Sequence, residues 1–256
     1  MKKFLIVSLF LMGFGCVSTS STAPPAAQSP VQGNEPYVAN FHYTPCHENA
    51  PGSVDVTFTV ANNHYKTSGG LHWFASSQFA NFPRAIREDF TEILTAKGFI
   101  VRGPFESYDL IPFQDKKVID LVLAPTVELT VALRDRKFTP VSIWIGGCDH
   151  IETGNVKVSG KIILEMKEIT TQELMWAKTI PVKEFSFVYS ARLKFQEYRN
   201  CVASKTYPCS KDILYEGIAR GVEGQYHDTM RYCQMLWIEF RTLRLLPMPL
   251  PVILRR

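Results

Sequence analysis

The chain has 256 residues, of which 46% are hydrophobic and 20% charged, and its formal net charge is +4. From about Tyr37 onward the composition is that of ordinary globular material, long enough for one large domain, and no second linker divides it. A net charge so near balance argues against nucleic acid as a partner and gives little reason to expect an acidic lipid surface.

The first residues have the pattern of a secretory signal peptide. Met1–Lys3 is a short basic start, and Phe4–Phe14 is almost entirely apolar. Spanning a hydrocarbon core takes about 20 helical residues, so this run is too short for a membrane span but has the length of a signal-peptide apolar region. We therefore predict a signal peptide over residues 1–15, whose removal takes away two lysines and lowers the net charge from +4 to +2.

The cysteine that ends the apolar run predicts a lipid anchor. Gly15-Cys16 resembles the lipobox of bacterial lipoproteins, although Gly13 stands where that pattern usually has leucine. The alternative is an ordinary signal peptide followed by a chance cysteine. Val17, rather than an aspartate, follows the cysteine, and the usual sorting pattern then indicates the outer membrane. We predict that Cys16 is lipidated and holds the protein at that membrane.

The segment after the cysteine predicts a tether. Residues 17–36 hold four prolines among small and hydroxylated residues, with a single charge. Their apolar surface is too small to offset the entropy lost on ordering, so we expect residues 16–36 to be disordered. Fully extended, such a segment reaches roughly 60–70 Å. The globular domain is predicted over residues 37–243.

The first half of the domain predicts a strand, a helix and a second strand. Val54–Val60 alternates strictly and is rich in β-branched residues, which is typical of a half-buried strand. Apolar residues then recur at helical spacing: Phe79, Phe82, Ile86, Phe90, Ile93 and Leu94. We expect a helix capped near Asn81, with Pro83 in its first turn and Gly98 at its end, followed by a strand over Phe99–Val101.

The middle of the domain predicts a long strand and a hairpin. Val118–Leu133 is apolar, its second half alternates, and Pro125 predicts a bend or bulge. A loop is expected over Leu133–Pro140. The inward face of the next strand holds Val158, Gly160, Ile162, Leu164 and Met166, and Thr170–Gln172 turns the chain back.

A second long helix closes the domain. Ser210 is its predicted N-cap. Its apolar stripe consists of Leu214, Ile218, Val222, Tyr226, Met230, Cys233, Trp237 and Phe240. The elements together predict an α+β fold, with a single mixed or antiparallel sheet and two long amphipathic helices packed on one face. Residues 244–256 form a proline-rich apolar tail, which either covers a core edge or binds a partner.

The remaining cysteines predict one disulfide and no metal site. Five remain after Cys16, an odd number for an exported protein. Cys201 and Cys209 are close enough in sequence to close a small loop, and pairing of either with Cys233 is the alternative. No CxxC pair or spaced Cys/His set is present, so we predict no metal and no cofactor.

No motif predicts catalysis. The sequence contains no nucleophile elbow, Walker loop or HExxH motif. Gly146–His150 puts a thiol near a histidine, but two glycines beside them favour a turn over an activated nucleophile. We therefore expect a non-catalytic protein.

A basic patch is the candidate ligand site. Arg134, Arg136 and Lys137, with Lys116 and Lys117 upstream, border the expected loop. Arginine holds a carboxylate with two parallel hydrogen bonds, so an exposed cluster here predicts an acidic sugar such as a sialic acid as the ligand. The alternative is a solvated loop with no ligand.

Three segments resemble the neuraminyllactose-binding haemagglutinin family of bacterial surface lipoproteins. They are SSQFANFPRAIREDFTEILTAKGFIV, PFESYDLIPFQDKKVIDLVLAPTVEL and NVKVSGKIILEMKEITTQELMWAKTIPV. The resemblance covers roughly Phe74 to Phe187 and implies a lipoprotein of the outer membrane or cell surface. It further implies sialyl-glycan binding, adhesion and a flagellar-sheath location. The family's basic hexapeptide follows the long strand, where this chain has the different sequence Arg134–Thr139.

Two functional hypotheses follow. The first is a sialyl-glycan-binding adhesin or haemagglutinin-like protein that uses Arg134, Arg136 and Lys137. The second is an envelope-assembly or flagellar-sheath-associated structural lipoprotein that binds a protein partner. The two differ in topology, since an adhesin must face outward.

Overall fold

The computed structural model describes residues 37–46, 54–61, 63–67, 71–144, 147–205 and 207–245. The predicted signal peptide, the lipidated Cys16, the tether to residue 36 and the tail from residue 246 lie outside the described residues. Contacts divide the chain into Met1–Asn34 and Glu35–Arg256. The fold is therefore that of the second unit.

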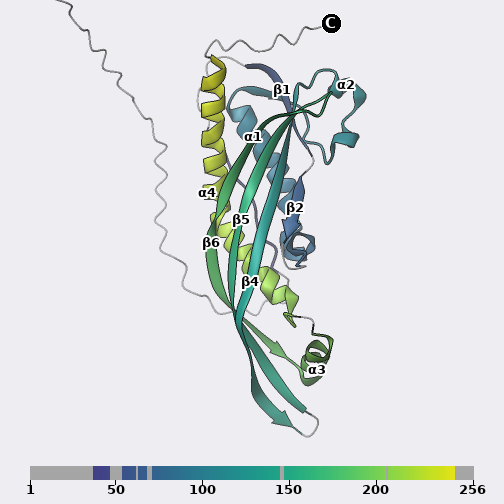
Figure 1. Cartoon of the computed structure of the whole chain (residues 1–256), viewed down its shortest axis with the longest axis vertical. Helices are drawn as coiled ribbons and strands as arrows, with labels where there is room; N and C mark the ends of the chain where they lie inside the picture. The colour runs from purple at the N-terminus through teal and green to yellow at the C-terminus, as the bar shows by residue number, and fades with distance from the viewer. Residues whose placement is uncertain are drawn as a thin grey trace, which may run out of the picture. The chain divides into compact units, whose positions relative to one another are not determined.

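The second unit is built on one mixed, open sheet, as predicted (Figure 1). Its strands in the described residues are β1 (Val54–Val60), β2 (His64–Thr67), β3 (Phe99–Val101), β4 (Leu121–Trp144), β5 (Gly147–Glu168) and β6 (Leu174–Leu193). The spatial order is β3-β1-β4-β5-β6, and β2 pairs with β4 beyond the end of β1. β1 and β2 run parallel to β4, whereas β4, β5 and β6 form an antiparallel meander.

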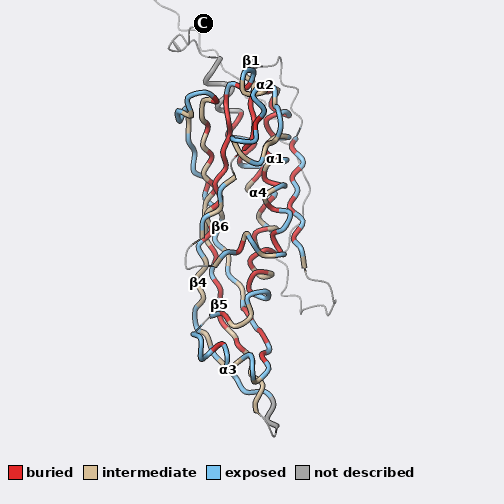
Figure 2. The backbone as a smooth tube through the Cα atoms, turned by 90° about the vertical axis from the view of Figure 1, so that its right-hand side faces the viewer, coloured by how far each residue is buried: buried red, intermediate tan, exposed pale blue. Residues whose placement is uncertain are grey.

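The two long helices lie on one side of this sheet, as Figure 2 shows. The helices are α1 (Phe82–Ala96), α2 (Phe113–Lys116), α3 (Phe195–Ser204) and α4 (Lys211–Leu245). Asn81 is the N-cap of α1 and Pro83 lies in its first turn. Gly98 follows the helix at φ 80, a conformation that glycine adopts without strain. The predicted helix bounds are thus confirmed.

The core lies between the meander and α1 and α4. Of the predicted inward face of β5, Val158, Ile162, Leu164 and Met166 are buried and Gly160 is partly buried, and Leu164 is fully inaccessible to solvent. The described side chains of the predicted α4 stripe are all buried too: Leu214, Ile218, Val222, Tyr226, Met230, Cys233 and Trp237. Phe187 and Phe185 of β6 occupy the space beside Gly217 and Gly221, where any Cβ would collide with their rings. Glycine is required there for the helix to approach the sheet.

The expected loop over Leu133–Pro140 is wrong. β4 continues to Trp144 and stays paired with β5, with one extra residue between Arg134 and Lys137. Asp135 takes a positive φ of 52 at this bulge, and its carboxylate accepts a hydrogen bond from the Asn155 amide at 3.0 Å. A β-bulge absorbs the extra residue and lets the ladder continue.

Of the bend or bulge predicted at Pro125, the bulge is absent, because the β4–β5 register is regular there. The Leu123 carbonyl accepts from the Ala61 N–H, so alternation directs the Pro125 nitrogen toward the same edge of β4. On that edge β1 pairing ends at Leu123 and β2 pairing begins at Thr126. The missing N–H therefore falls in the gap between two partner strands.

An extended N-terminal segment, residues 37–46, was not predicted from the sequence. Its residues alternate between buried and exposed, with Ala39, Phe41 and Tyr43 buried. Gln234 of α4 accepts from the Tyr43 hydroxyl at 2.5 Å and donates to the Cys46 carbonyl at 2.7 Å. The segment is thereby held against α4.

A buried carboxylate joins α1, α4 and this segment. Asp89 is 1% exposed and accepts a hydrogen bond from the Tyr226 hydroxyl at 2.6 Å. His42 Nδ1 lies 3.7 Å from its other oxygen. Burial raises the pKa of the Asp89 carboxyl above its ordinary value, against the opposing effect of the Tyr226 hydrogen bond.

The core predicts a graded response to truncation. Leu164→Ala should lower the free energy of unfolding by about 2–5 kcal/mol and Trp237→Ala by about 3–5 kcal/mol, because both remove fully buried side chains. Lys161→Ala, at an exposed pair with Glu128, should change it by under about 0.5 kcal/mol. Urea denaturation measures all three, and equal effects would contradict the assigned faces.

Asp89 predicts a pH-dependent stability difference. A raised folded-state pKa means that the protonated carboxyl favours folding below the ordinary aspartate pKa of about 3.9, and that this contribution is lost as pH rises through the folded pKa. Asp89→Asn keeps an acceptor for Tyr226 but does not ionise. The variant should therefore gain stability relative to the wild type as pH rises from about 4 toward neutrality. Urea denaturation across that range tests it, and a pH-independent difference would contradict it.

Candidate functional site

The predicted basic cluster does not form a single site. Val131 and Leu133 pack toward the core, so alternation directs Arg134 to the opposite face of the sheet. The extra residue at the bulge then returns Arg136 to the core side, while Lys137 points the same way as Arg134. Arg134 and Lys137 are exposed.

The two upstream lysines are remote from this position. Lys116 lies over the Tyr108 ring at 4.0 Å, and Lys117 lies over the Phe113 ring at 4.6 Å, both beside α2. β4 starts just after α2, and its bulge is roughly 50 Å further along the strand at about 3.3 Å per residue. Of the five cations, Arg136 alone enters the site described below.

Arg136 lies against a fully buried carboxylate. Glu152 is completely inaccessible to solvent, and its Oε2 accepts hydrogen bonds from the Tyr189 hydroxyl at 2.7 Å and the Cys209 backbone N–H at 3.0 Å. Arg136 Nε lies 4.0 Å from its Oε1, which has no hydrogen-bond partner among the described residues. A buried charge needs compensation, and Arg136 supplies it.

Burial also acts on the phenol beside this carboxylate. Burial, followed by the hydrogen bond to Glu152, raises the pKa of Tyr189 above its ordinary value. Tyr189 therefore remains a hydrogen-bond donor to Glu152 at neutral pH.

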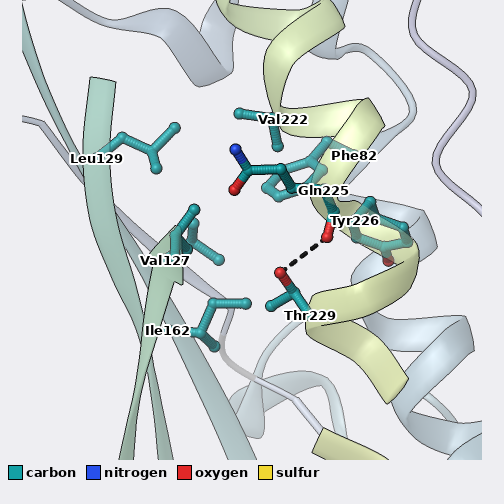
Figure 3. Close-up of a pocket in the computed structure, with 9 residues that line it drawn as sticks. Phe82, Val127, Leu129, Ile162, Val222, Gln225, Tyr226 and Thr229 are labelled. Atoms are coloured by element: carbon teal, nitrogen blue, oxygen red, sulfur yellow. Dashed lines mark hydrogen bonds between the residues drawn. The ribbon is translucent and has the colours of Figure 1, made fainter. Parts of the chain in front are cut away.

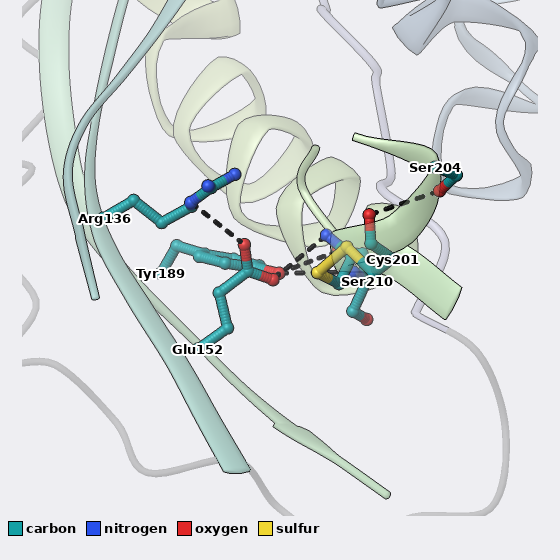
Figure 4. Close-up of a disulfide and its surroundings, with 7 residues drawn as sticks. Arg136, Glu152, Tyr189, Cys201, Ser204 and Ser210 are labelled. Atoms are coloured by element: carbon teal, nitrogen blue, oxygen red, sulfur yellow. Dashed lines mark hydrogen bonds and ion pairs between the residues drawn. A yellow bond between two sulfur atoms is a disulfide. The ribbon is translucent and has the colours of Figure 1, made fainter. Parts of the chain in front are cut away.

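Two aromatic rings pack against the guanidinium. Its carbon lies 3.3 Å from the centre of the Tyr207 ring and 5.1 Å from that of Phe138. Stacking of this kind is favourable for arginine and restricts its rotamers. Figure 4 shows Nε directed at Glu152, with the terminal guanidinium nitrogens further away. The side chain keeps 27% of its surface exposed. We call Arg136, Phe138, Glu152, Tyr189 and Tyr207 the arginine site.

A short covalent loop carries Tyr207 and the Cys209 N–H into place. Cys201, in α3, is bonded through sulfur to Cys209, eight residues later. The alternative partner Cys233 is a free, buried thiol. The Tyr198 ring of α3 packs on Phe138 at 5.2 Å, which holds the helix against β4. The arginine site is therefore covered by α3 and the disulfide loop.

The residues predicted as a turn near Cys148 lie in a strand instead. Gly147–His150 begins β5, and residues 145–146 are outside the described residues. The Cys148 thiol contacts the Asp149 carbonyl at 3.4 Å, and the His150 ring stacks on Tyr198 at 3.8 Å. The Cys148 and His150 side chains thus contact other groups, the Asp149 carbonyl and the Tyr198 ring.

A small cavity lies between the meander and α4 (Figure 3). It measures about 20 Å³ and is lined mainly by apolar side chains. Gln225 contributes a buried Oε1 that has no hydrogen-bond partner in the described part of the chain, and Thr229 donates to the Gln225 carbonyl at 2.9 Å. A cavity of this size accommodates about one water and is too small for a sugar.

Among the described residues, no group of three or more His, Cys, Asp or Glu side chains is placed to hold a metal ion. No helix in the same part of the chain is both long and apolar enough to span a membrane.

Sequence reasoning missed the partners of Arg136. Glu152 shares the inward side of β5 with Val156 and Val158, and a glutamate at an inward position of an alternating strand is the signal that would have found it. Tyr207 lies in a predicted disulfide loop, and nothing in its local pattern points to Arg136.

Comparison with known proteins gives only low similarities. No family model matches the chain, and no curated protein sequence matches it. Among solved structures, a protein from Helicobacter pylori described as a homologue of neuraminyllactose-binding haemagglutinin is 13% identical, with a TM-score of 0.42, covering 77% of this chain and 99% of its own.

Two further solved structures are similar over most of their lengths. A Xanthomonas campestris protein of the family DUF330 is 10% identical, with a TM-score of 0.34, covering 82% of this chain and 97% of its own. A lipoprotein from Neisseria meningitidis is 11% identical, with a TM-score of 0.23, covering 59% and 94%. Similarities this low carry no argument about function.

Proposed function

We propose that this chain is a lipid-anchored, non-catalytic protein of the bacterial outer membrane that binds sialylated glycans through the arginine site. The anchor is supported by the basic start, the short apolar run and Cys16. The ligand class is supported by the sequence resemblance and by the geometry around Arg136.

The observation that carries the proposal is the preorganised guanidinium. Arg136 is held by Tyr207, Phe138 and Glu152, so little rotamer entropy is lost when a ligand binds its exposed edge. Planar N–H donors match a carboxylate with two parallel hydrogen bonds. Tyr207, 37% exposed, adds an aromatic surface for the apolar face of a sugar ring.

The second candidate is an envelope lipoprotein that binds a protein partner. The observation that favours it is an apolar surface near α2, where Leu110 is 61%, Phe113 71% and Val118 46% exposed. Contiguous exposed apolar residues often mark protein interfaces. This candidate takes the place of the first if glycan binding fails the test below.

The anchor is tested at Cys16. Cys16→Ser should release the protein from the membrane fraction and abolish labelling by a palmitate analogue, since the acyl chains supply membrane affinity. Cys46→Ser, at an exposed cysteine, is the control and should change neither. Membrane association without labelling of the wild type would contradict the lipid anchor.

Glycan binding is tested at Arg136. Arg136→Lys keeps a cation near Glu152 but removes the planar fork, so it should weaken binding of sialyllactose at least tenfold, about 1.4 kcal/mol. Arg134→Ala, a neighbouring cation on the opposite face of the sheet, is the matched control and should leave binding unchanged. Calorimetric titration measures affinity, and thermal unfolding verifies that each variant is folded.

Lactose is the decisive ligand control, because it lacks the carboxylate. The wild type should bind sialyllactose and not lactose. Equal binding of the two sugars, binding of neither, or an equal loss in Arg134→Ala and Arg136→Lys would contradict glycan recognition by the arginine site.

A further inference from the structure

The end of β6 presents an open sheet edge. β6 is the terminal strand of the sheet, paired with β5 on one side, and no strand among the described residues pairs with its other side. Such an edge exposes a row of unpaired backbone N–H and C=O groups that can pair with another strand. We call the segment Phe185–Leu193 the β6 edge.

The β6 edge lacks the usual protection against strand pairing. Pro181 and a register irregularity between Val182 and Phe185 lie before it. From Phe185 to Ala191 the sequence holds no proline and no charge. Val188 is 73% exposed, the largest exposed fraction among the exposed large hydrophobic residues described. Natural edge strands usually carry a charge or a bulge at such a position.

The outward residues are arranged symmetrically about Val188, with a serine on each side and then one residue of each charge sign. In chain order they are Glu184, which lies in the register irregularity just before the β6 edge, Ser186, Val188, Ser190 and Arg192. All five are exposed. When two antiparallel copies of this segment pair with Val188 opposite Val188, serine faces serine and Glu184 faces the second copy's Arg192.

We propose that the β6 edge is a self-association surface, and that a second copy of this chain pairs with it antiparallel, centred on Val188. The pairing gives hydrogen-bond partners to the unpaired backbone N–H and C=O groups of both edges and joins the two sheets. It creates two symmetric contacts between Glu184 and Arg192, because a two-fold interface uses each residue twice.

The two charged residues are accessible to a second copy. Glu184 is 55% exposed, and Lys157 lies 2.8 Å from its carboxylate. Arg192 is 67% exposed, and its guanidinium lies 3.3 Å from Asp149. Both pairs sit at the surface, so each charge can add an intermolecular partner of opposite sign.

The symmetry also suits two tethered chains. A two-fold axis that joins antiparallel edges runs perpendicular to the sheet, so both helix layers remain on one side. Phe187 of the β6 edge contacts Gly217 of α4. Tyr37, the first described residue, contacts Glu223 and Arg220, and Glu223 is about 9 Å along the helix from Gly217. In both copies Tyr37 therefore lies on the helix side of the joined sheet and near the two-fold axis. This placement fits two copies anchored in one membrane.

Cross-linking tests the proposed register. Val188→Cys puts a thiol on the two-fold axis, so a short bis-maleimide should link two full-length chains in detergent or in vesicles. Met175→Cys, at another exposed apolar position of β6, is the matched control, and the wild type corrects for the cysteines that the chain already has. We expect at least tenfold more cross-linked dimer from Val188→Cys than from either control.

Sedimentation tests the energetics. Val188→Lys sets two like charges together on the axis and should make the chain monomeric, while circular dichroism shows an intact fold because this side chain is exposed. Glu184→Arg should weaken dimerisation at least tenfold, and adding Arg192→Glu should restore it. Equal cross-linking of Val188→Cys and Met175→Cys, or an unchanged oligomer in Val188→Lys, overturns the proposal. Cross-linking to a different envelope protein instead of a second copy overturns it as well.

Discussion

The length of the β4–β5 ladder is the constraint on which the rest of this fold depends. At about 3.3 Å per residue, the 24 residues of β4 extend on the order of 80 Å, whereas the 35 residues of α4 extend about 50 Å at 1.5 Å per residue. One helix therefore cannot cover the inward face of the ladder. The Tyr189 hydroxyl donates a hydrogen bond to the carbonyl of Ser210, just before α4 begins. The ladder continues past that point to Gly147.

The part of the ladder beyond the start of α4 is covered by other elements. α3 and the disulfide loop supply the cover there, and the Tyr198 ring of α3 packs on Phe138 of β4. This part of the ladder holds the buried Glu152 because Tyr189, Cys209 and Arg136 all engage its carboxylate. The same contacts keep Arg136 in one orientation. The contacts that cover this part of the ladder therefore also preorganise Arg136.

Local periodicity predicted those elements whose burial is uniform along their length. α1, β3 and the inward face of β5 follow the sequence pattern because each faces one continuous core. β4 was predicted too short, since Arg134–Lys137 has the composition of a loop while its backbone pairs with β5. The N-terminal segment was missed because its alternation serves packing on helices, and hydrogen bonds with Gln234, nearly two hundred residues away, hold it.

The candidate site shows most clearly what a linear pattern omits. Three cations adjacent in sequence suggested convergence, yet a strand sends neighbours to opposite faces, and a single inserted residue at Asp135 decides which face each occupies. The rest of the site comes from three other segments: Glu152 from β5, Tyr189 from β6, which donates to Glu152, and Tyr207 from the disulfide loop. The ladder places Phe138 opposite Glu152, so the register that extends β4 also assembles the site. An arginine held by non-local contacts is chemically distinct from its exposed neighbours, and for that reason Arg134 serves as the control for Arg136.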